Sequence, residues 1–177
     1  SWVILNYLGN HSERLAQRYM PQVQRIADAQ VLMFRISLEA RQAMLVSDAA
    51  AKQQSLDRIG AFRQQKLELL QQFEAAIDTE REREIFAQIR SADDDFWRLA
   101  QQVTANIRAG DNAGALALLQ SDLVPARDRM LQSMAQQRQL QQEKVDGAML
   151  STERITFNTK LALAILTALV FLIAAHH

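Results

Sequence analysis

The sequence predicts an all-α protein: an antiparallel up-down-up-down four-helix bundle whose first and fourth helices continue into transmembrane helices. Three observations support this prediction. The 177 residues include only five glycines and two prolines, with abundant Ala, Gln, Leu, Glu and Arg, which favours helix over sheet. Apolar residues recur at helical spacing along most of the chain. The breaks between these periodic segments are short, and short connections favour antiparallel neighbours.

The first predicted helix extends from the N-terminus to about Asp48. It opens with "SWVILNYLGN", an apolar stretch that contains Trp2 and Tyr7, and these residue types are enriched at membrane interfaces. We therefore expect residues 1–9 to be the remnant of a first transmembrane helix. Residues 10–160 are then expected to form an extracytoplasmic four-helix bundle.

The second and third predicted helices each carry an apolar stripe. In the second helix the stripe is interrupted by Lys66. The third helix is expected to begin at Thr79, because Thr79 followed three residues later by Glu82 matches a capping box. The two stripes consist of Leu56, Ile59, Phe62, Leu69, Leu70, Phe73 and Ile77 in the second helix, and of Ile85, Ile89, Ala92, Phe96, Leu99, Val103 and Ile107 in the third.

A loop and a long fourth helix complete the predicted bundle. The clearest loop is "AGDNAG", residues 109–114, with two glycines beside an Asp-Asn pair. In the fourth helix Pro125 favours a kink, as Pro21 does in the first. Residues 161–175 carry no charge, and we expect them to be a truncated second transmembrane helix, since spanning a bilayer takes roughly twenty residues. Residues 176–177 are expected to be a tag remnant; the alternative is that both apolar ends pack inside a soluble protein.

Composition argues against several classes of function. Lys plus Arg and Asp plus Glu both number 20, so no net charge attracts nucleic acid. The absence of cysteine excludes disulfides and thiolate catalysis. Apart from the two C-terminal histidines the chain has only His11, which leaves little from which to build a metal site. With no nucleophile beside a base and no phosphate-binding loop, we expect no enzymatic activity, no metal and no cofactor.

Three arginines have apolar neighbours three and four positions away, which places them on apolar helix faces. They are Arg41, Arg127 and Arg35. If the two helices that carry them leave the membrane together, Arg41 lies about 48 Å along the first and Arg127 about 51 Å along the fourth, at about 1.5 Å per residue. These two arginines are therefore expected at one level, with Arg35 about 10 Å lower. The stripe that contains Arg41 is formed by Ala27, Val31, Phe34, Leu38 and Leu45.

Two guanidinium groups on apolar faces at one level repel each other unless an anion lies between them. A carboxylate is the natural anion, because it matches the planar fork of arginine. The alternative to ligand binding is that these arginines pair within the protein. Arg35 would then pair with Glu39, and Arg41 and Arg127 with the acids at 93–95. The predicted ligand-binding residues are Arg41 and Arg127, with Arg35, Ser37, Phe34 and Val124 beside them.

This arrangement of helices resembles the sensor region of bacterial methyl-accepting chemotaxis proteins. The most specific segments are "RISLEARQAMLVSD" before the first turn, "AGDNAGALALL" at the start of the fourth helix, and "DLVPARDRM" around Pro125. The resemblance implies a homodimer in the bacterial inner membrane with its sensor domain in the periplasm. It also implies that a small anionic ligand binds near the membrane-distal end, and that a shift of the fourth helix carries the signal to cytoplasmic partners.

One departure from this family bears on the ligand. Aspartate-sensing members have Thr directly after the proline of the fourth helix, whereas this chain has Ala126 followed by Arg127. A di- or tricarboxylic acid, or an aromatic acid docked against Phe34 and Trp97, is therefore expected. Alternatives are the sensor of a histidine kinase and a structural membrane coiled coil without a small ligand. The first helix is expected to pair with its dimer mate through Val23, Ile26, Met33 and Met44.

Overall fold

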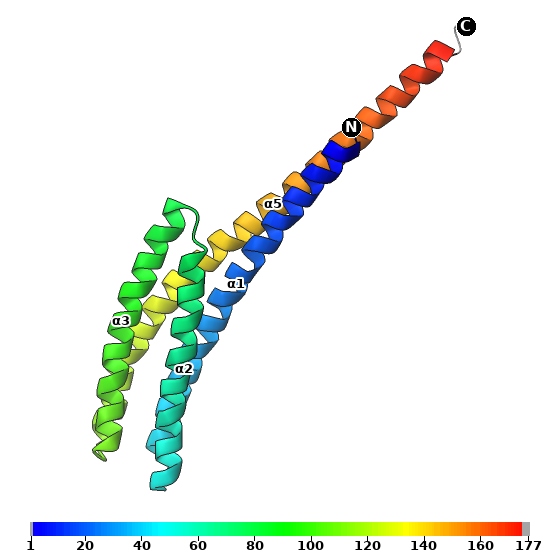
Figure 1. The fold of residues 1–177 in the computed structure, drawn as a ribbon. Helices are drawn as coiled ribbons and strands as arrows, with labels where there is room; N and C mark the ends of the chain where they lie inside the picture. The colour runs from blue at the N-terminus through cyan, green and yellow to red at the C-terminus, as the bar shows by residue number, and fades with distance from the viewer. Residues whose placement is uncertain (1, 175–177) are drawn as a thin grey trace. The chain divides into compact units, whose positions relative to one another are not determined.

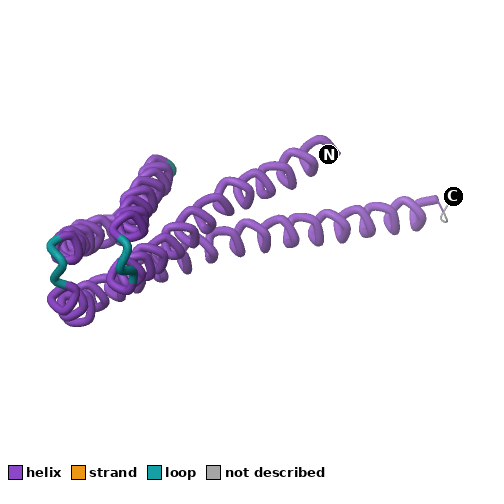
Figure 2. The backbone as a smooth tube through the Cα atoms, turned by 90° about the horizontal axis from the view of Figure 1, so that it is seen from below, coloured by secondary structure: helices purple, strands orange, loops and turns teal. Residues whose placement is uncertain are grey.

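A computed structural model describes residues 2–174, and within them it contains helices and short loops without strands (Figures 1 and 2). The prediction of an all-α protein is confirmed. In chain order the helices are α1 (Trp2–Leu45), α2 (Ala49–Ala75), α3 (Glu80–Arg108), α4 (Asn112–Leu118), the π-helical turn η1 (Leu119–Leu123) and α5 (Val124–Ala174).

The chain divides into two units, one formed by residues 22–140 and the other by the described parts of residues 1–21 and 141–177. Within residues 22–140, α1, α2, α3 and the run α4–η1–α5 lie side by side as a four-helix bundle (Figure 1). Short loops make successive helices antiparallel, so the predicted up-down-up-down arrangement is confirmed. The end of this bundle where α1 ends and α4 begins is called the loop end below.

Polar contacts between helices show which ones are neighbours. Glu39 of α1 accepts a hydrogen bond from Arg58 of α2 at 2.9 Å, and Glu74 of α2 pairs with Arg90 of α3. The α3 and α5 helices are joined where the Gln137 Nε2 donates to the Glu82 carbonyl at 2.9 Å. Between α5 and α1, Arg138 Nη1 donates to Gln30 Oε1 at 3.1 Å. Each helix is therefore in contact with two others, around a single core.

The helix starts follow from side chains that satisfy free backbone N–H groups. The Asp48 carboxylate accepts the Ala51 N–H at 2.9 Å, so Asp48 caps α2 and α1 ends earlier, at Leu45. The Thr79 hydroxyl oxygen accepts the Glu82 N–H at 3.3 Å and its hydroxyl donates to Glu82 Oε1 at 2.7 Å. The predicted start of the third helix is therefore confirmed.

The predicted loop at 109–114 is too long. Gly110 adopts a φ of 78°, which a side chain at that position would disfavour. Asp111 then caps α4 by accepting the Gly114 N–H at 2.9 Å, so Asn112 is already helical. The Asp-Asn pair thus starts a helix where the sequence pattern suggested a loop.

The two prolines have different effects. α1 continues through Pro21. In front of Pro125 the chain widens into the π turn η1, where the Val124 N–H donates to the Leu119 carbonyl. Proline lacks an N–H, and in a regular helix its ring would clash with the carbonyl four residues earlier, that of Ser121. The expected irregularity at Pro125 is therefore present as an inserted residue.

The core of the bundle is built from the inner faces of all four helices. Each residue of the predicted α3 stripe is buried except Ala92, which is half-buried. The largest fully buried apolar side chains are Ile26, Met33, Ile36, Ile59, Phe73, Ile89, Phe96, Ile107, Leu119, Leu123 and Met130.

The apolar core contains one charged pair. Lys66 of α2 has no exposed surface, and its ammonium group pairs with the Asp93 carboxylate of α3. The same group lies 5.0 Å from the centre of the Phe96 ring and donates to Met33 Sδ at 3.6 Å. Burial lowers the pKa of Lys66 below its usual value, while the charge of Asp93 acts in the opposite direction. The residue that interrupts the predicted α2 stripe is therefore a core residue with its own counter-ion.

The C-terminal apolar stretch lies in α5. Among the described residues, one helical run, Asn112–Phe171, is long and apolar enough in part to cross a membrane, as judged from length and composition. From Leu161 to Phe171 all side chains are exposed. The boundaries of the expected transmembrane segments at 1–9 and 161–175 remain predictions, and the expected tag at 176–177 lies outside the described residues.

The buried pair predicts a specific stability pattern. Asp93→Ala leaves the Lys66 charge in the core without its partner, which should cost about 3–5 kcal/mol of unfolding free energy. Because the pKa of Lys66 is lowered on folding, this loss should shrink as the pH rises and the unpaired lysine gives up its proton. Thermal unfolding followed by circular dichroism measures both effects. The double variant Lys66→Met with Asp93→Leu serves as control and should stay within about 1 kcal/mol of the parent or exceed it; equal losses in the single and double variants would contradict this account.

Candidate ligand-binding site

α1 has a second apolar face that the bundle leaves uncovered. Its residues are spaced by three and four positions, and together they are called the outer stripe: Ala27, Val31, Phe34, Leu38, Arg41 and Leu45. Four of them are large apolar side chains with 48%, 53%, 65% and 81% of their surface exposed, in the order Val31, Phe34, Leu38 and Leu45. The stripe that sequence periodicity placed in an apolar seam therefore faces outward in the single chain.

The residues expected to pair α1 with a dimer mate lie on a different face. Ile26 and Met33 have no exposed surface, because both belong to the core of their own bundle. Val23 and Met44 are half-buried. The expected dimer seam is therefore wrong for Ile26 and Met33, since side chains already packed in the core are not free to contact a second chain.

The structure brings two of the predicted site residues together on the outer stripe. The Arg127 guanidinium of α5 lies over the Phe34 ring of α1, with Cζ 5.3 Å from the ring centre. This distance is within the range of a cation–π contact. Only 15% of the Arg127 side chain is exposed. The seam between α1 and α5 thus presents an aromatic ring beneath a positive charge.

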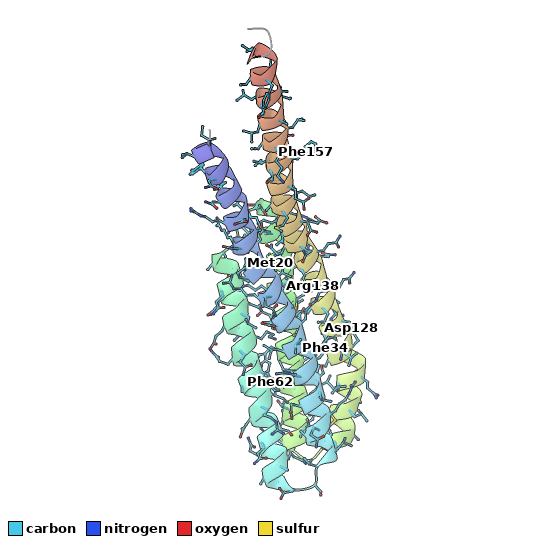
Figure 3. All side chains as sticks on the ribbon, turned by 90° about the vertical axis from the view of Figure 1, so that its right-hand side faces the viewer. Met20, Phe34, Phe62, Asp128, Arg138 and Phe157 are labelled. Atoms are coloured by element: carbon cyan, nitrogen blue, oxygen red, sulfur yellow. The ribbon has the colours of Figure 1, made fainter. Side chains whose placement is uncertain are left out.

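Asp128, an acid beside Arg127, was not among the predicted site residues. Asp128 Oδ1 accepts hydrogen bonds from Arg127 Nη2 at 3.0 Å and Nε at 3.1 Å, and it lies on the same visible side of the bundle as Phe34 (Figure 3). Residues three and four positions apart share a helix face, whereas Asp128 directly follows Arg127 and lies outside that pattern. Its side chain is 59% exposed, so water weakens the pairing and an incoming anion can compete for Arg127.

Ser37 and Val124 were predicted to contact the ligand, but neither is well exposed on this surface. Ser37 is 2% exposed, and its hydroxyl donates to the Met33 carbonyl of the same helix at 3.3 Å. Val124 is half-buried and packs against the core. Both residues shape the helices beneath the site.

Arg41 is exposed and lies closer to the loop end than Arg127 does. Arg127 contacts Phe34, which precedes Arg41 by seven residues, about 10 Å along the helix. The predicted common level of the two arginines is therefore not seen within one chain. The prediction required that equal numbers of residues from the membrane ends bring the two helices to one level. At the loop end the two helices are instead joined by Asn112 Nδ2, which donates to the Met44 carbonyl at 3.0 Å.

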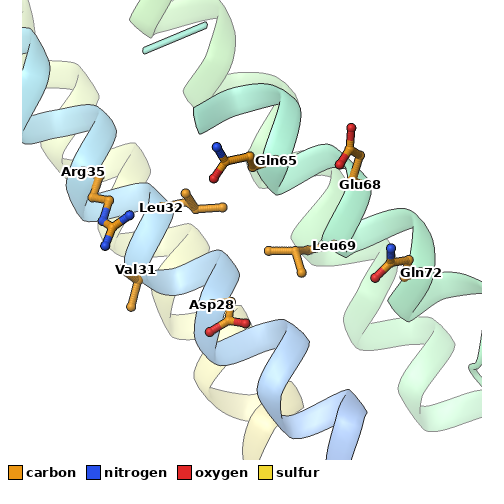
Figure 4. Close-up of a pocket in the computed structure, with 8 residues that line it drawn as sticks. All are labelled: Asp28, Val31, Leu32, Arg35, Gln65, Glu68, Leu69 and Gln72. Atoms are coloured by element: carbon orange, nitrogen blue, oxygen red, sulfur yellow. The ribbon is translucent and has the colours of Figure 1, made fainter. Parts of the chain in front are cut away.

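Arg35 lies in a separate groove of about 370 Å³ between α1 and α2 (Figure 4). Its guanidinium lies 5.8 Å from the centre of the Phe62 ring. Glu39, its expected partner, pairs with Arg58 instead. The groove also exposes two carboxylates, and its lining is Asp28, Val31, Leu32, Arg35, Gln65, Glu68, Leu69 and Gln72.

Two of the three acids at 93–95 of α3 have other partners. Asp93 pairs with Lys66, and Asp95 lies 3.8 Å from Arg98. Trp97 lies under the Arg63 guanidinium of α2 at 4.2 Å, on the seam opposite Phe34. An aromatic ligand on the outer stripe therefore has Phe34, and not Trp97, as its stacking partner. In the part of the chain that the structure describes, no cluster of His, Cys, Asp or Glu could hold a metal ion.

Residues 1–156 match the family model described as a four helix bundle sensory module for signal transduction. The match covers the whole bundle and every residue of the candidate site. No curated protein matches the chain.

Proposed function

The chain belongs to the family of four-helix-bundle sensory modules for signal transduction, and we propose that it is the sensor region of a bacterial chemoreceptor for small organic acids. The proposal places the bundle in the periplasm and the apolar part of α5 in the inner membrane. The module itself binds and transmits and has no catalytic role. The sensor of a histidine kinase has the same architecture, and the two functions differ in the cytoplasmic domain that the sensor controls.

One observation carries the proposal: the Arg127 guanidinium lies over Phe34 on an exposed apolar stripe that also contains Arg41. Covering the stripe removes water from both cations, which is unfavourable unless an anion accompanies them. A carboxylate binds arginine through two parallel hydrogen bonds. A di- or tricarboxylate can engage more than one guanidinium, and an aromatic carboxylate can stack on Phe34.

A second copy of the chain is the proposed cover for the outer stripe. Val31, Phe34, Leu38 and Leu45 recur at the spacing of a two-stranded coiled coil. Burying their exposed surface stabilises a dimer by about 25 cal/mol for each Å² of apolar area. Arg41 on the stripe and Arg127 over Phe34 then lie at the dimer interface, where an acid is shielded from water.

The π turn η1 suggests how a bound acid moves α5. η1 holds one residue more than an α-helical turn, and it ends at Leu123, four residues before Arg127. A change of one residue in the winding of this turn would advance the following helix by about 1.5 Å, the rise of one residue. An acid produces this shift if it binds one register more tightly than the other.

Acids should stabilise the folded chain. A specific acid at a hundred times its dissociation constant raises the unfolding free energy by about 2.7 kcal/mol. Thermal unfolding of the full chain in detergent with benzoate, succinate or citrate measures this. Arg127→Gln should remove stabilisation by an acid bound on the outer stripe, and the control Arg129→Gln, at an exposed neighbouring position, should retain it. If none of the acids stabilises the chain, it has no acid-sensing role of the kind proposed.

Removing the acid that competes for Arg127 should tighten binding on the outer stripe. An exposed ion pair is worth about 0.2–1 kcal/mol, so Asp128→Asn should raise the affinity for such an acid by up to about fivefold at low salt. Calorimetric titration at two salt concentrations gives the affinities, and Asp122→Asn on η1 is the matched control. Weaker binding in Asp128→Asn would mean that Asp128 holds Arg127 in place for the ligand.

A charge on the outer stripe should dissociate the dimer. Leu38→Glu places two carboxylates opposite each other across the proposed seam, where like charges repel. Sedimentation equilibrium of the full chain in detergent should then show monomers. Ala87→Glu adds the same charge at an exposed position on α3 and should leave the dimer intact. A dimer that survives Leu38→Glu has its interface elsewhere.

A further inference from the structure

The groove between α1 and α2 is a polar surface that acid binding on the outer stripe does not use. Its volume of about 370 Å³ is within the size range of small-molecule sites. Asp28, Arg35 and Glu68 line it together with two glutamines, and all five side chains are exposed. The groove shares only Val31 with the outer stripe. All of its charged groups therefore come from one chain and lie beside the proposed dimer seam.

The three charged groups of the groove do not neutralise one another. Within residues 2–174 the Arg35 guanidinium has no hydrogen-bond or ion-pair partner. Asp28 Oδ1 accepts a hydrogen bond from the uncharged amide of Gln24 at 2.7 Å. Glu68 Oε1 accepts one from the amide of Gln64 at 3.4 Å. One cation and two anions thus line the same groove without pairing, so each can take an opposite charge from a ligand.

The charges lie at separate places along the groove. Asp28 and Arg35 are two helical turns apart on α1, about 10 Å along its axis. The Arg35 guanidinium points along α1 toward the Asp28 end, whereas Glu68 points away from α1 (Figure 4). Between the two ends, Leu32 and Leu69 point toward each other (Figure 4). The groove therefore has a positive end, an apolar middle and a negative end.

The α2 wall of the groove carries an amide at each end. α2 runs antiparallel to α1, and the alignment of the two helices is marked by the Lys66 ammonium, which donates to Met33 Sδ at 3.6 Å. Gln65 is therefore opposite the positive end, and Gln72 is opposite the negative end (Figure 4). A glutamine amide can donate to a carboxylate through its N–H groups and accept from an ammonium group through its carbonyl. Each end thus combines a charge with a hydrogen-bonding group that suits the same ligand group.

We propose that this groove binds an elongated amphoteric molecule, in which a short methylene chain joins a carboxylate to a primary ammonium group. The carboxylate pairs with Arg35, the ammonium group pairs with Asp28, and the methylenes cover Leu32 and Leu69. A dicarboxylate would place its second charge beside Asp28, where like charges repel. An α-amino acid carries both charges on one carbon and reaches only one end. The groove is thus a second site, independent of the outer stripe and specific for a different class of ligand.

Calorimetric titration of the full chain in detergent tests this assignment. The probes are 5-aminopentanoate, its isomer 2-aminopentanoate, pentanoate and pentylamine, and titration of each probe into detergent alone gives the blank. 5-Aminopentanoate should bind at least threefold more tightly than each of the others, because it alone can pair with both ends at once. A 5-aminopentanoate affinity no greater than that of any other probe would overturn the proposal.

Substitutions in the groove test each end separately. Arg35→Gln should reduce the affinity for 5-aminopentanoate at least threefold, to that of pentylamine, and Asp28→Asn should reduce it as much, to that of pentanoate. Glu68→Gln is the matched control in the same groove and should keep the affinity within twofold. Circular dichroism verifies that each variant folds. A loss of binding in Glu68→Gln but not in Asp28→Asn would overturn the assigned negative end.

One further variant separates the groove from the outer stripe. Arg127→Gln removes the cation over Phe34 and should keep the 5-aminopentanoate affinity within twofold. Loss of binding in Arg127→Gln with retention in Arg35→Gln would overturn the groove site in favour of the outer stripe. Failure of 5-aminopentanoate to bind the parent chain would overturn the groove assignment alone, because acid sensing on the outer stripe is measured with benzoate, succinate and citrate.

Discussion

A four-helix bundle can bury only one face of each helix, and α1 has two apolar faces. Ile26, Met33 and Ile36 fill the core, while Phe34, Leu38 and Leu45 remain exposed. An apolar stripe of this kind marks an interaction surface in a folded protein. The proposed dimer and the proposed acid site beside its seam both depend on this excess of apolar surface on one helix.

The charged residues of the bundle differ in whether they have a counter-ion. Lys66 is in the core and has a carboxylate partner from the neighbouring helix, because an unpaired charge there is too costly. Arg127 has only the well-exposed Asp128, and Arg41 has no partner among the described residues. Cations that lie beside apolar surface without a dedicated counter-ion are available to an external anion. Asp93 therefore offsets the cost of burying the Lys66 charge, whereas the two arginines are suited to ligand binding.

Local signals in the sequence predicted the fold well, and long-range geometry was predicted poorly. Thr79 and Glu82 fixed the start of α3, and helical periodicity identified its buried face, since both depend on residues within a few turns. Periodicity could not decide which apolar face of α1 points into the core, so the expected dimer residues Ile26 and Met33 proved to be buried. Counting residues from the membrane ends missed the 10 Å offset between Arg127 and Arg41, because the register between helices depends on contacts such as that of Asn112 with the Met44 carbonyl. The groove between α1 and α2 combines two segments that are far apart in the sequence, which no local pattern reveals.

The covering of the outer stripe by a second copy is the claim on which this account depends most. The chain has no cysteine, so a single Leu38→Cys substitution reports on one position only. Under mild oxidation in detergent, this variant should form a covalent dimer rapidly, while Ala87→Cys on the exposed face of α3 should form a covalent dimer much more slowly. A Leu38→Cys chain that cross-links no faster than Ala87→Cys would contradict the account, because the exposed face of α1 would then have no second copy against it.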